Sequence, residues 1–186
     1  SLHKRGWRPI QVKSPLNESI AAGLLLLSGW DRKSPLVDPM CGSGTFVIEA
    51  ALLAAERAPG LRRRFAFMRW PDFERRAWEA LRSAAEGRAL AALDFALEGA
   101  DRHAGALSLA ARGARAAGVE RLVRFTHAEA AAFAPRVPPA VVFVNPPWGG
   151  RLGEGEELAA SWRDLGNFLR ERCPGARAFV LSGSPE

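Results

Sequence analysis

Cysteine is scarce in this 186-residue chain, with Cys41 and Cys173 as the two examples. Two cysteines cannot build a disulfide framework, and the absence of any C-x-x-C pair argues against a structural zinc site. The three histidines, His3, His103 and His127, also lack the spacing of metal ligands. We therefore expect no metal in this protein, and the low cysteine content favours a cytoplasmic location.

Long apolar runs are absent as well. The longest lies around Gly23–Leu27 and is far shorter than the roughly 20 residues that a membrane-spanning helix needs. No signal-peptide pattern opens the chain, so we expect neither a leader nor a membrane segment. A hydrophobic content of 48% and a charged content of 25% are ordinary for a globular protein, and the length suits one domain.

Acidic residues are outnumbered, with 20 Asp and Glu against 26 Lys and Arg, which leaves a formal net charge of +6. The sequence pI is about 10.5. This balance favours a polyanionic partner such as nucleic acid. Because arginine-rich sequences also arise in GC-rich genomes, charge alone leaves the partner open.

Apolar strand-like segments alternate with helical ones along most of the chain. Strands are expected near 35–38, 95–99, 122–126, 141–144 and 178–181, and helices over 14–27, 46–58, 104–117 and 158–172. Ser14-Pro15 is expected to cap the first helix and Gly29 to end it. The alternation predicts an α/β fold with a mostly parallel sheet and helices on both faces, in which 14–186 form the domain and 1–13 a linker or docking strand.

One segment, about 59–92, stands outside this alternation and is predicted to be an insertion. It combines arginines with aromatic side chains, namely Arg62, Arg63, Arg64, Phe65, Phe67, Arg69, Trp70 and Trp78. Arginines beside aromatic rings suit nucleic acid, because they neutralise phosphates while the rings stack on bases. The same residues can instead form the edge of a packed insertion, and the sequence leaves both interpretations open.

Polar residues follow the first four predicted strands, which is where open α/β sheets bind ligands. The first group runs from Asp38 to Thr45 and reads D-P-M-C-G-S-G-T. Gly42 and Gly44 let the backbone approach a ligand closely. The group has neither the third glycine of a dinucleotide fingerprint nor the G-K-[ST] of a P-loop, and the Asp38 carboxylate suits an amino group better than a phosphate. The alternative is a plain glycine-rich turn between strand and helix.

Asp101 and Glu129 follow the second and third predicted strands. A carboxylate at the end of the second strand accepts hydrogen bonds from both hydroxyls of a ribose in nucleoside-binding α/β folds. An acid after the third strand can accept a hydrogen bond from an adenine amino group. Taken alone, each would be a solvated surface acid, but their order after the glycine turn favours a ligand that contains a nucleoside.

The fourth group, Asn145-Pro146-Pro147-Trp148, directly follows the apolar strand Val141–Val144. Its prolines remove backbone donors and stiffen the loop, so that carbonyl groups can act as acceptors beside the Asn145 oxygen. Trp148 offers a face on which a base can stack. Two acceptors that hold the hydrogens of an exocyclic amine direct its lone pair toward an electrophilic methyl group. The alternative is a proline-rich turn with a buried tryptophan.

These residues together resemble the THUMP-associated N2-guanine RNA methyltransferases, and within that family the enzymes of large-subunit ribosomal RNA. The resemblance covers nearly the whole chain. It rests on L-H-K-R-G-W-R at 2–8, P-L-N-E at 15–18, D-P-M-C-G-S-G-T-F-V-I-E-A at 38–50 and N-P-P-W-G-G-R-L-G at 145–153. The insertion also resembles the family's A-P-G-L…R-R-F-A-F…W segment.

The resemblance implies a class I, Rossmann-like methyltransferase fold that uses S-adenosylmethionine to methylate N2 of a guanine in RNA. The methionine end of the cofactor would contact Asp38 and Cys41–Thr45, the ribose Asp101, and the adenine Glu129. The full set of expected cofactor-binding residues is Asp38, Pro39, Cys41, Gly42, Ser43, Gly44, Thr45, Asp101, Arg102, Glu129 and Asn145. The expected catalytic residues are Asn145, Pro146, Pro147 and Trp148, and the candidates for RNA contact are Arg62, Arg63, Arg64, Arg69 and Arg151.

The chain departs from the family at a few positions. His103 stands where the family usually has a second acid, so we expect a weaker or rearranged ribose contact. Trp148 replaces a more usual Tyr, and Glu129 a more usual Asp, and both changes keep the chemistry. The family also has an upstream THUMP region that binds RNA, and a C-terminal β-hairpin that would follow Pro185. We therefore expect this chain to be the catalytic part of a longer protein.

Two other kinds of function remain open. The N-P-P-aromatic sequence also serves methyltransferases that act on other planar nitrogens, such as a transfer-RNA guanine, an adenine in DNA or a glutamine side chain in a protein. His103 is the one feature that favours a non-catalytic RNA-binding module. The choice of ribosomal RNA rests on the resemblance alone.

Overall fold

The computed structural model describes residues 5, 7, 16–61, 63–147 and 156–183. Within these ranges five strands form one sheet in the order β3-β2-β1-β4-β5, and every pairing is parallel. The strands are β1 (Leu36–Asp38), β2 (Leu97–Asp101), β3 (Arg124–His127), β4 (Val141–Val144) and β5 (Arg177–Val180). The strand order reverses between β1 and β4, and ligands bind such sheets at the carboxyl ends beside this switch point.

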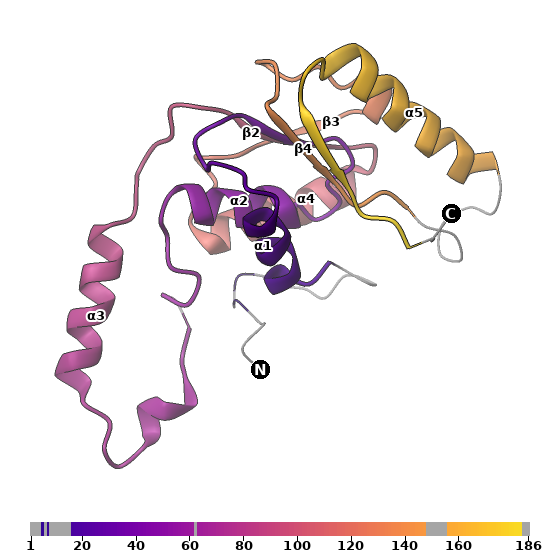
Figure 1. Cartoon of the computed structure of the whole chain (residues 1–186). Coiled ribbons are helices and arrows are strands. Elements are labelled where there is room, and N and C mark those ends of the chain that lie inside the picture. The colour runs from indigo at the N-terminus through magenta and orange to yellow at the C-terminus, as the bar shows by residue number, and fades with distance from the viewer. Residues whose placement is uncertain (1–4, 6, 8–15, 62, 148–155, 184–186) are drawn as a thin grey trace.

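Helices cover both faces of the sheet (Figure 1). On one face lie α1 (Glu18–Leu27), α2 (Thr45–Ala54) and α4 (Ala104–Ala117), and on the other lies α5 (Glu156–Arg172). Because successive strand residues point to opposite faces, Leu36 packs with the first group of helices and Val37 packs near Phe168 of α5. The predicted α/β architecture with helices on both faces is confirmed.

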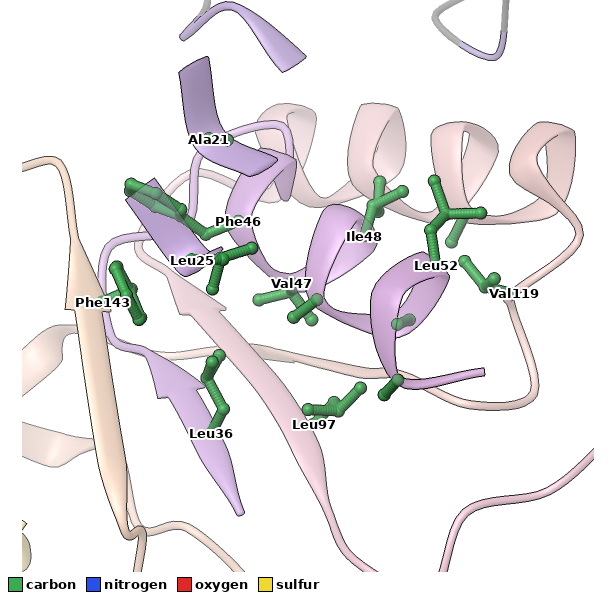
Figure 2. Close-up of a cluster of buried hydrophobic side chains, with 14 of the residues drawn as sticks. Ala21, Leu25, Leu36, Phe46, Val47, Ile48, Leu52, Leu97, Val119 and Phe143 are labelled. Atoms are coloured by element: carbon green, nitrogen blue, oxygen red, sulfur yellow. The ribbon is translucent and has the colours of Figure 1, made fainter. Parts of the chain in front are cut away.

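Helix α2 is the most deeply buried helix, and it places the glycine turn. Its sequence, TFVIEAALLA, is apolar apart from Thr45 at its start and Glu49, as expected of a helix enclosed on all sides. Figure 2 shows Val47 pointing toward the strands, while Ile48 and Leu52 point toward α4. This packing fixes Gly44, the residue that caps α2, at the end of the sheet where β1 finishes.

The expected cap of the first helix was wrong. Helix α1 begins at Glu18, and its cap is Asn17 rather than Ser14. The Asn17 side chain accepts hydrogen bonds from the backbone N–H of Ser19 at 2.9 Å and of Ile20 at 3.4 Å. Serine and asparagine are equally good caps, so residue type alone does not favour Ser14 over Asn17. The predicted end near Gly29 is confirmed.

Helix α2 ends four residues before the expected Ala58. Glu56 adopts a left-handed conformation with φ of 51°, and Arg57 N–H donates to the Leu52 carbonyl at 2.9 Å. A left-handed residue at the end of a helix is usually glycine, so a glutamate at this position does not predict a helix end. The helix predicted over 104–117 is confirmed with both of its ends, and Gly118, with φ of 74°, follows the last residue of α4.

The insertion contains a 3-10 turn, η1 (Ala66–Arg69), and a helix, α3 (Arg75–Gly87), that the sequence pattern did not predict. No residue of α3 is buried, and Figure 1 shows this helix standing apart from the sheet. Aromatic rings hold the insertion together, with centroids 5.2 to 6.3 Å apart, and they belong to Phe65, Phe67, Trp70, Phe73 and Trp78. The chain returns to the body where Leu90 N–H donates to the Ala55 carbonyl at 2.8 Å.

Candidate active site

The parallel sheet brings the predicted ligand-binding residues to one edge. Asp38 ends β1, Asp101 ends β2, and Asn145 directly follows β4. Because all strands are parallel, these positions share what we call the carboxyl-end edge. The opposite, amino-end edge is where α2 finishes and β2 begins, and the insertion leaves the domain there.

Asp101 braces the glycine turn. One of its carboxylate oxygens accepts from Gly42 N–H and the other from His103 N–H, both at 2.8 Å. A third bond, from Cys41 N–H to the Ala100 carbonyl at 2.8 Å, ties the turn to β2. Each carboxylate oxygen has a second lone pair, so Asp101 can hold the turn and still accept hydrogen bonds from a ligand.

The turn requires both of its glycines, for different reasons. Gly42 has φ of 53° and Gly44 φ of 76°, a region that other residues enter only with strain. A Cβ at Gly44 would lie 2.8 Å from the Phe125 ring, whereas one at Gly42 would meet nothing within 4 Å. Gly44 therefore seats the start of α2 against β3, while open space lies beside Gly42 for a ligand.

Asp38 is a buried carboxylate whose surroundings favour a cationic ligand. It is 2% exposed and accepts a hydrogen bond from Met40 N–H at 3.1 Å. Burial, and to a smaller extent the charge of Asp101, hold the pKa of Asp38 well above its usual range. Among the residues that the structure describes, no lysine, arginine or histidine pairs with it. An ammonium group from a ligand would supply the missing charge.

Cys41 in the turn is not an activated nucleophile. Burial, with the nearby charges of Asp38 and Asp101, raises the pKa of the Cys41 thiol well above its usual value, which keeps the thiol protonated. Pro39 and Thr45 are buried, and Ser43 is half-buried. Within the described ranges, no three His, Cys, Asp or Glu side chains come together as a metal site.

None of the helices in the described part of the chain is long and apolar enough to cross a membrane.

Glu129 and Arg102 are exposed beside the carboxyl ends of β3 and β2. Glu129 caps a short 3-10 turn, η2 (Ala130–Ala132), through its backbone carbonyl, so its carboxylate is not used as a cap. The Arg102 carbonyl contacts Nε2 of His127 at 2.9 Å. The side chains of Glu129 and Arg102 thus lie at the carboxyl-end edge, where the sequence pattern predicts that a nucleoside binds.

The loop after β4 completes the edge as far as the structure describes it. Pro146 is buried, whereas Asn145 and Pro147 are half-buried. Trp148 and Arg151 lie outside the described residues, as does Arg62.

The other candidate RNA contacts are not brought to this edge. Arg63 lies over the Phe65 ring, 5.1 Å from its centroid, and Arg64 and Arg69 are exposed on the insertion. Helix α2 separates the insertion from the glycine turn, because it runs from the carboxyl-end edge to the amino-end edge. Any RNA contact made by these arginines is therefore remote from the loop after β4.

Sequence reasoning missed some residues that support the site. Phe125 lies against Gly44, and Gly99 lies against Cys41, where a Cβ would be 2.9 Å from the sulfur. Neither residue carries a sequence signal beyond its type. Glu49, which lies outside the site, did carry one, because a charged residue within an otherwise apolar helix requires a partner.

The strand order, the glycine turn after β1, the acid that ends β2 and the N-P-P sequence after β4 define a class I, Rossmann-like, S-adenosylmethionine-dependent methyltransferase. Solved structures share the fold. SMU.472, in complex with SAH, is 32% identical with a TM-score of 0.87, and the match covers 99% of this chain and 48% of that one. A Listeria monocytogenes protein named as an N6-adenine-specific DNA methylase is 35% identical, with a TM-score of 0.88 and the same coverage.

Residues 5–185 match the RMKL-like methyltransferase domain of UPF0020, and the chain belongs to this family. The ribosomal RNA large subunit methyltransferase K/L of Vibrio campbellii is 39% identical over 194 residues, covering 100% of this chain and 27% of the relative. The chain therefore spans about a quarter of the length of this curated relative. The resemblance inferred from the sequence motifs is confirmed.

Proposed function

We propose that this chain is the catalytic part of an RNA methyltransferase that transfers the methyl group of S-adenosylmethionine to N2 of a guanine in large-subunit ribosomal RNA. The observation that carries the proposal is the position of Asn145-Pro146-Pro147 at the carboxyl-end edge, which it shares with Asp38 and Asp101. The name of the Vibrio relative and the SAH bound to SMU.472 support it.

The residues at this edge fit the cofactor. The buried Asp38 carboxylate suits the ammonium of the methionine part, and open space beside Gly42 lets the ligand cross the turn. Asp101, held in place by two backbone N–H groups, would accept from the ribose hydroxyls. Glu129, exposed at the end of β3, would accept from the adenine amino group.

The loop after β4 would hold the methyl acceptor. An exocyclic amine is a poor nucleophile, because its lone pair is delocalised into the ring. Asn145 Oδ1 and a carbonyl of the proline pair would accept its two hydrogens and leave the lone pair directed at the methyl group. S-adenosylmethionine, when bound, supplies that methyl group as an electrophile. Trp148 would stack on the base, and the chemistry then needs positioning rather than a strong general base.

The substrate RNA extends beyond this chain's active site. A guanine within folded RNA must leave its stack to reach a pocket at a strand end, so base flipping is part of the proposal. Because the Vibrio relative is nearly four times longer, we assign much of the RNA affinity to an upstream THUMP region. Residues 1–13 would then link that region to a catalytic domain of 14–186 whose insertion spans about 59–92. Arg151 would contact RNA next to the catalytic loop.

The test is to identify the methylated nucleoside. Full-length protein and radiolabelled S-adenosylmethionine are incubated with unmodified ribosomal RNA, transfer RNA, DNA and protein, and each is then digested. We expect N2-methylguanosine from the ribosomal RNA. N6-methyladenine from DNA would instead support the activity named for the Listeria relative. RNA binding without transfer to any substrate would point to a non-catalytic module.

A further inference from the structure

Glu49 is a buried carboxylate that the candidate active site does not use. It lies in the middle of α2 and is 1% exposed. Burial raises the pKa of Glu49 to about 7, against the opposite effects of the Arg5 charge and a hydrogen bond from Trp7. A charged group is costly to bury unless it is paired, so its partners show what this position is for.

Those partners come from the start of the chain. Trp7 Nε1 donates to one Glu49 oxygen at 3.3 Å, and Arg5 Nη2 forms an ion pair with the other at 3.3 Å. Trp7 is 4% exposed, which makes it as buried as residues of the central core. The N-terminal segment is thus anchored on α2 through a charge-assisted contact and a large buried ring.

Helix α4 is shaped to receive that ring. A Cβ at Gly113 would lie 3.1 Å from Cζ3 of Trp7 and 3.2 Å from Cδ1 of Ile48. Glycine inside a helix costs about 1 kcal/mol relative to alanine, and here its lack of a side chain makes room for the tryptophan. Leu52 and Ala117 line the adjoining pocket, between the two helices that Figure 2 shows side by side. We call Arg5, Trp7, Glu49 and Gly113 the Trp7 dock.

Helix α2 connects the Trp7 dock to the active site. Its first residue, Thr45, adjoins the glycine turn, and Glu49 follows four residues later, or about 6 Å along the helix axis. We propose that the Trp7 dock fixes the RNA-binding part of the full-length protein relative to the carboxyl-end edge, with Glu49 as the positioning residue. This inference rests on the proposed function, because it requires that sequence N-terminal to Arg5 binds RNA.

The physical effect of the dock is to limit orientation. Without the dock, the RNA-binding part and the active site would no longer be held in one arrangement, so RNA that contacts both would bind with a lower effective concentration, while the geometry of the bound complex would stay the same. The cofactor pocket uses other residues and would not change. Loss of the dock should therefore raise KM for RNA and leave both the cofactor affinity and kcat at saturating RNA unchanged.

The experiment uses full-length protein with three substitutions that act on different parts of the dock. Trp7→Ala removes the ring, Gly113→Leu fills its place, and Glu49→Leu removes the acceptor. In each, we expect KM for RNA to rise about tenfold, kcat and the S-adenosylmethionine Kd to stay within about threefold, and trypsin to cleave faster after Arg5, which the dock holds against Glu49. Glu49→Gln keeps an acceptor for Trp7 but loses the charge that pairs with Arg5, so its KM for RNA should lie between those of wild type and Glu49→Leu.

Gly105→Leu is the matched control, because Gly105 lies on the same helix and a Cβ there would meet nothing within 4 Å. Its KM for RNA should equal that of wild type. The proposal is overturned if trypsin shows the linker released in Trp7→Ala while KM for RNA is unchanged. It is equally overturned if cofactor affinity and kcat fall together with Tm, since that pattern belongs to a purely structural role. A wild-type protein that fails to methylate RNA would refute the proposed function first, and this role with it.

Discussion

At the scale of single residues, both the brace on the glycine turn and the proposed ribose contact depend on Asp101, and one measurement tests their loss. Asp101→Ala removes the brace on Gly42 and the proposed ribose acceptor together. Charge-assisted hydrogen bonds contribute about 1.5–3 kcal/mol, so the affinity for S-adenosylmethionine should fall roughly ten- to a hundredfold in calorimetry. Asp94→Ala, which removes an exposed acid before β2, is the control and should bind normally. An unchanged affinity in Asp101→Ala would remove this residue from the cofactor site.

In the proposed mechanism Asn145 holds the methyl acceptor rather than the cofactor, so its substitution should separate binding from chemistry. In Asn145→Ala we expect methyl transfer in a single-turnover assay to be lost, because one acceptor of the amine hydrogens is gone. The affinity for S-adenosylmethionine should stay within a few-fold of wild type. Near-normal transfer in this variant would contradict the proposed mechanism.

Glu49 makes the stability of the protein depend on pH. Its pKa is about 7 in the folded protein, against 4.5 for an unperturbed glutamate. Between these pH values Glu49 therefore binds more protons in the folded protein than in the unfolded chain. The contribution of Glu49 to the free energy of unfolding is therefore greatest below pH 4.5. It falls by on the order of 3 kcal/mol as the pH rises through 7. Urea unfolding of wild type and Glu49→Gln across this window should show a flatter profile for the variant. Parallel profiles would mean that Glu49 does not titrate there.

The types of the candidate site residues could be predicted from the sequence, but their partners could not. Asp38, Asp101 and Asn145 each follow an apolar strand, and position at a strand end is a local property of the sequence. The bond from Gly42 to Asp101 joins residues 59 positions apart, and the contact of Gly44 with Phe125 depends on how β2 and β3 pair. Such contacts follow from the order of strands in the sheet, which local pattern does not contain.

At the scale of elements, the ends of helices show how well nearby residues predict where a helix begins or ends. Helix α4 ends at Ala117 as predicted, with Gly118 after it, whereas α2 ends before the left-handed Glu56, a residue that does not indicate a helix end. Asn17 gives a measurable case, because its side chain accepts two backbone N–H groups of α1. Asn17→Ala should lower the free energy of unfolding by about 1 kcal/mol, while Asn17→Asp should keep it, since aspartate caps equally well. Equal stabilities in urea for all three proteins would show that α1 does not depend on this cap.

At the scale of the whole molecule, the sheet and its helices could be predicted from the alternation of strands and helices, but the place of the insertion could not. Composition put Arg62, Arg63 and Arg64 beside aromatic residues and suggested RNA. The topology then set this insertion at the amino-end edge, the length of α2 away from the glycine turn. RNA that contacts both edges must therefore extend along the molecule rather than touch it at one point.

The dependence of RNA affinity on salt measures whether the insertion takes part. Each phosphate neutralised on single-stranded RNA changes the slope of log affinity against log salt by roughly 0.7. Replacing Arg62, Arg63 and Arg64 with alanine in the full-length protein should thus flatten the slope by up to about two units, with cofactor affinity unchanged. The control removes the same charge from another exposed surface, at Arg112, Arg115 and Arg121, and should leave the slope near that of wild type. If the insertion variant kept the wild-type slope, its arginines would serve only to pack against rings, as Arg63 does on Phe65.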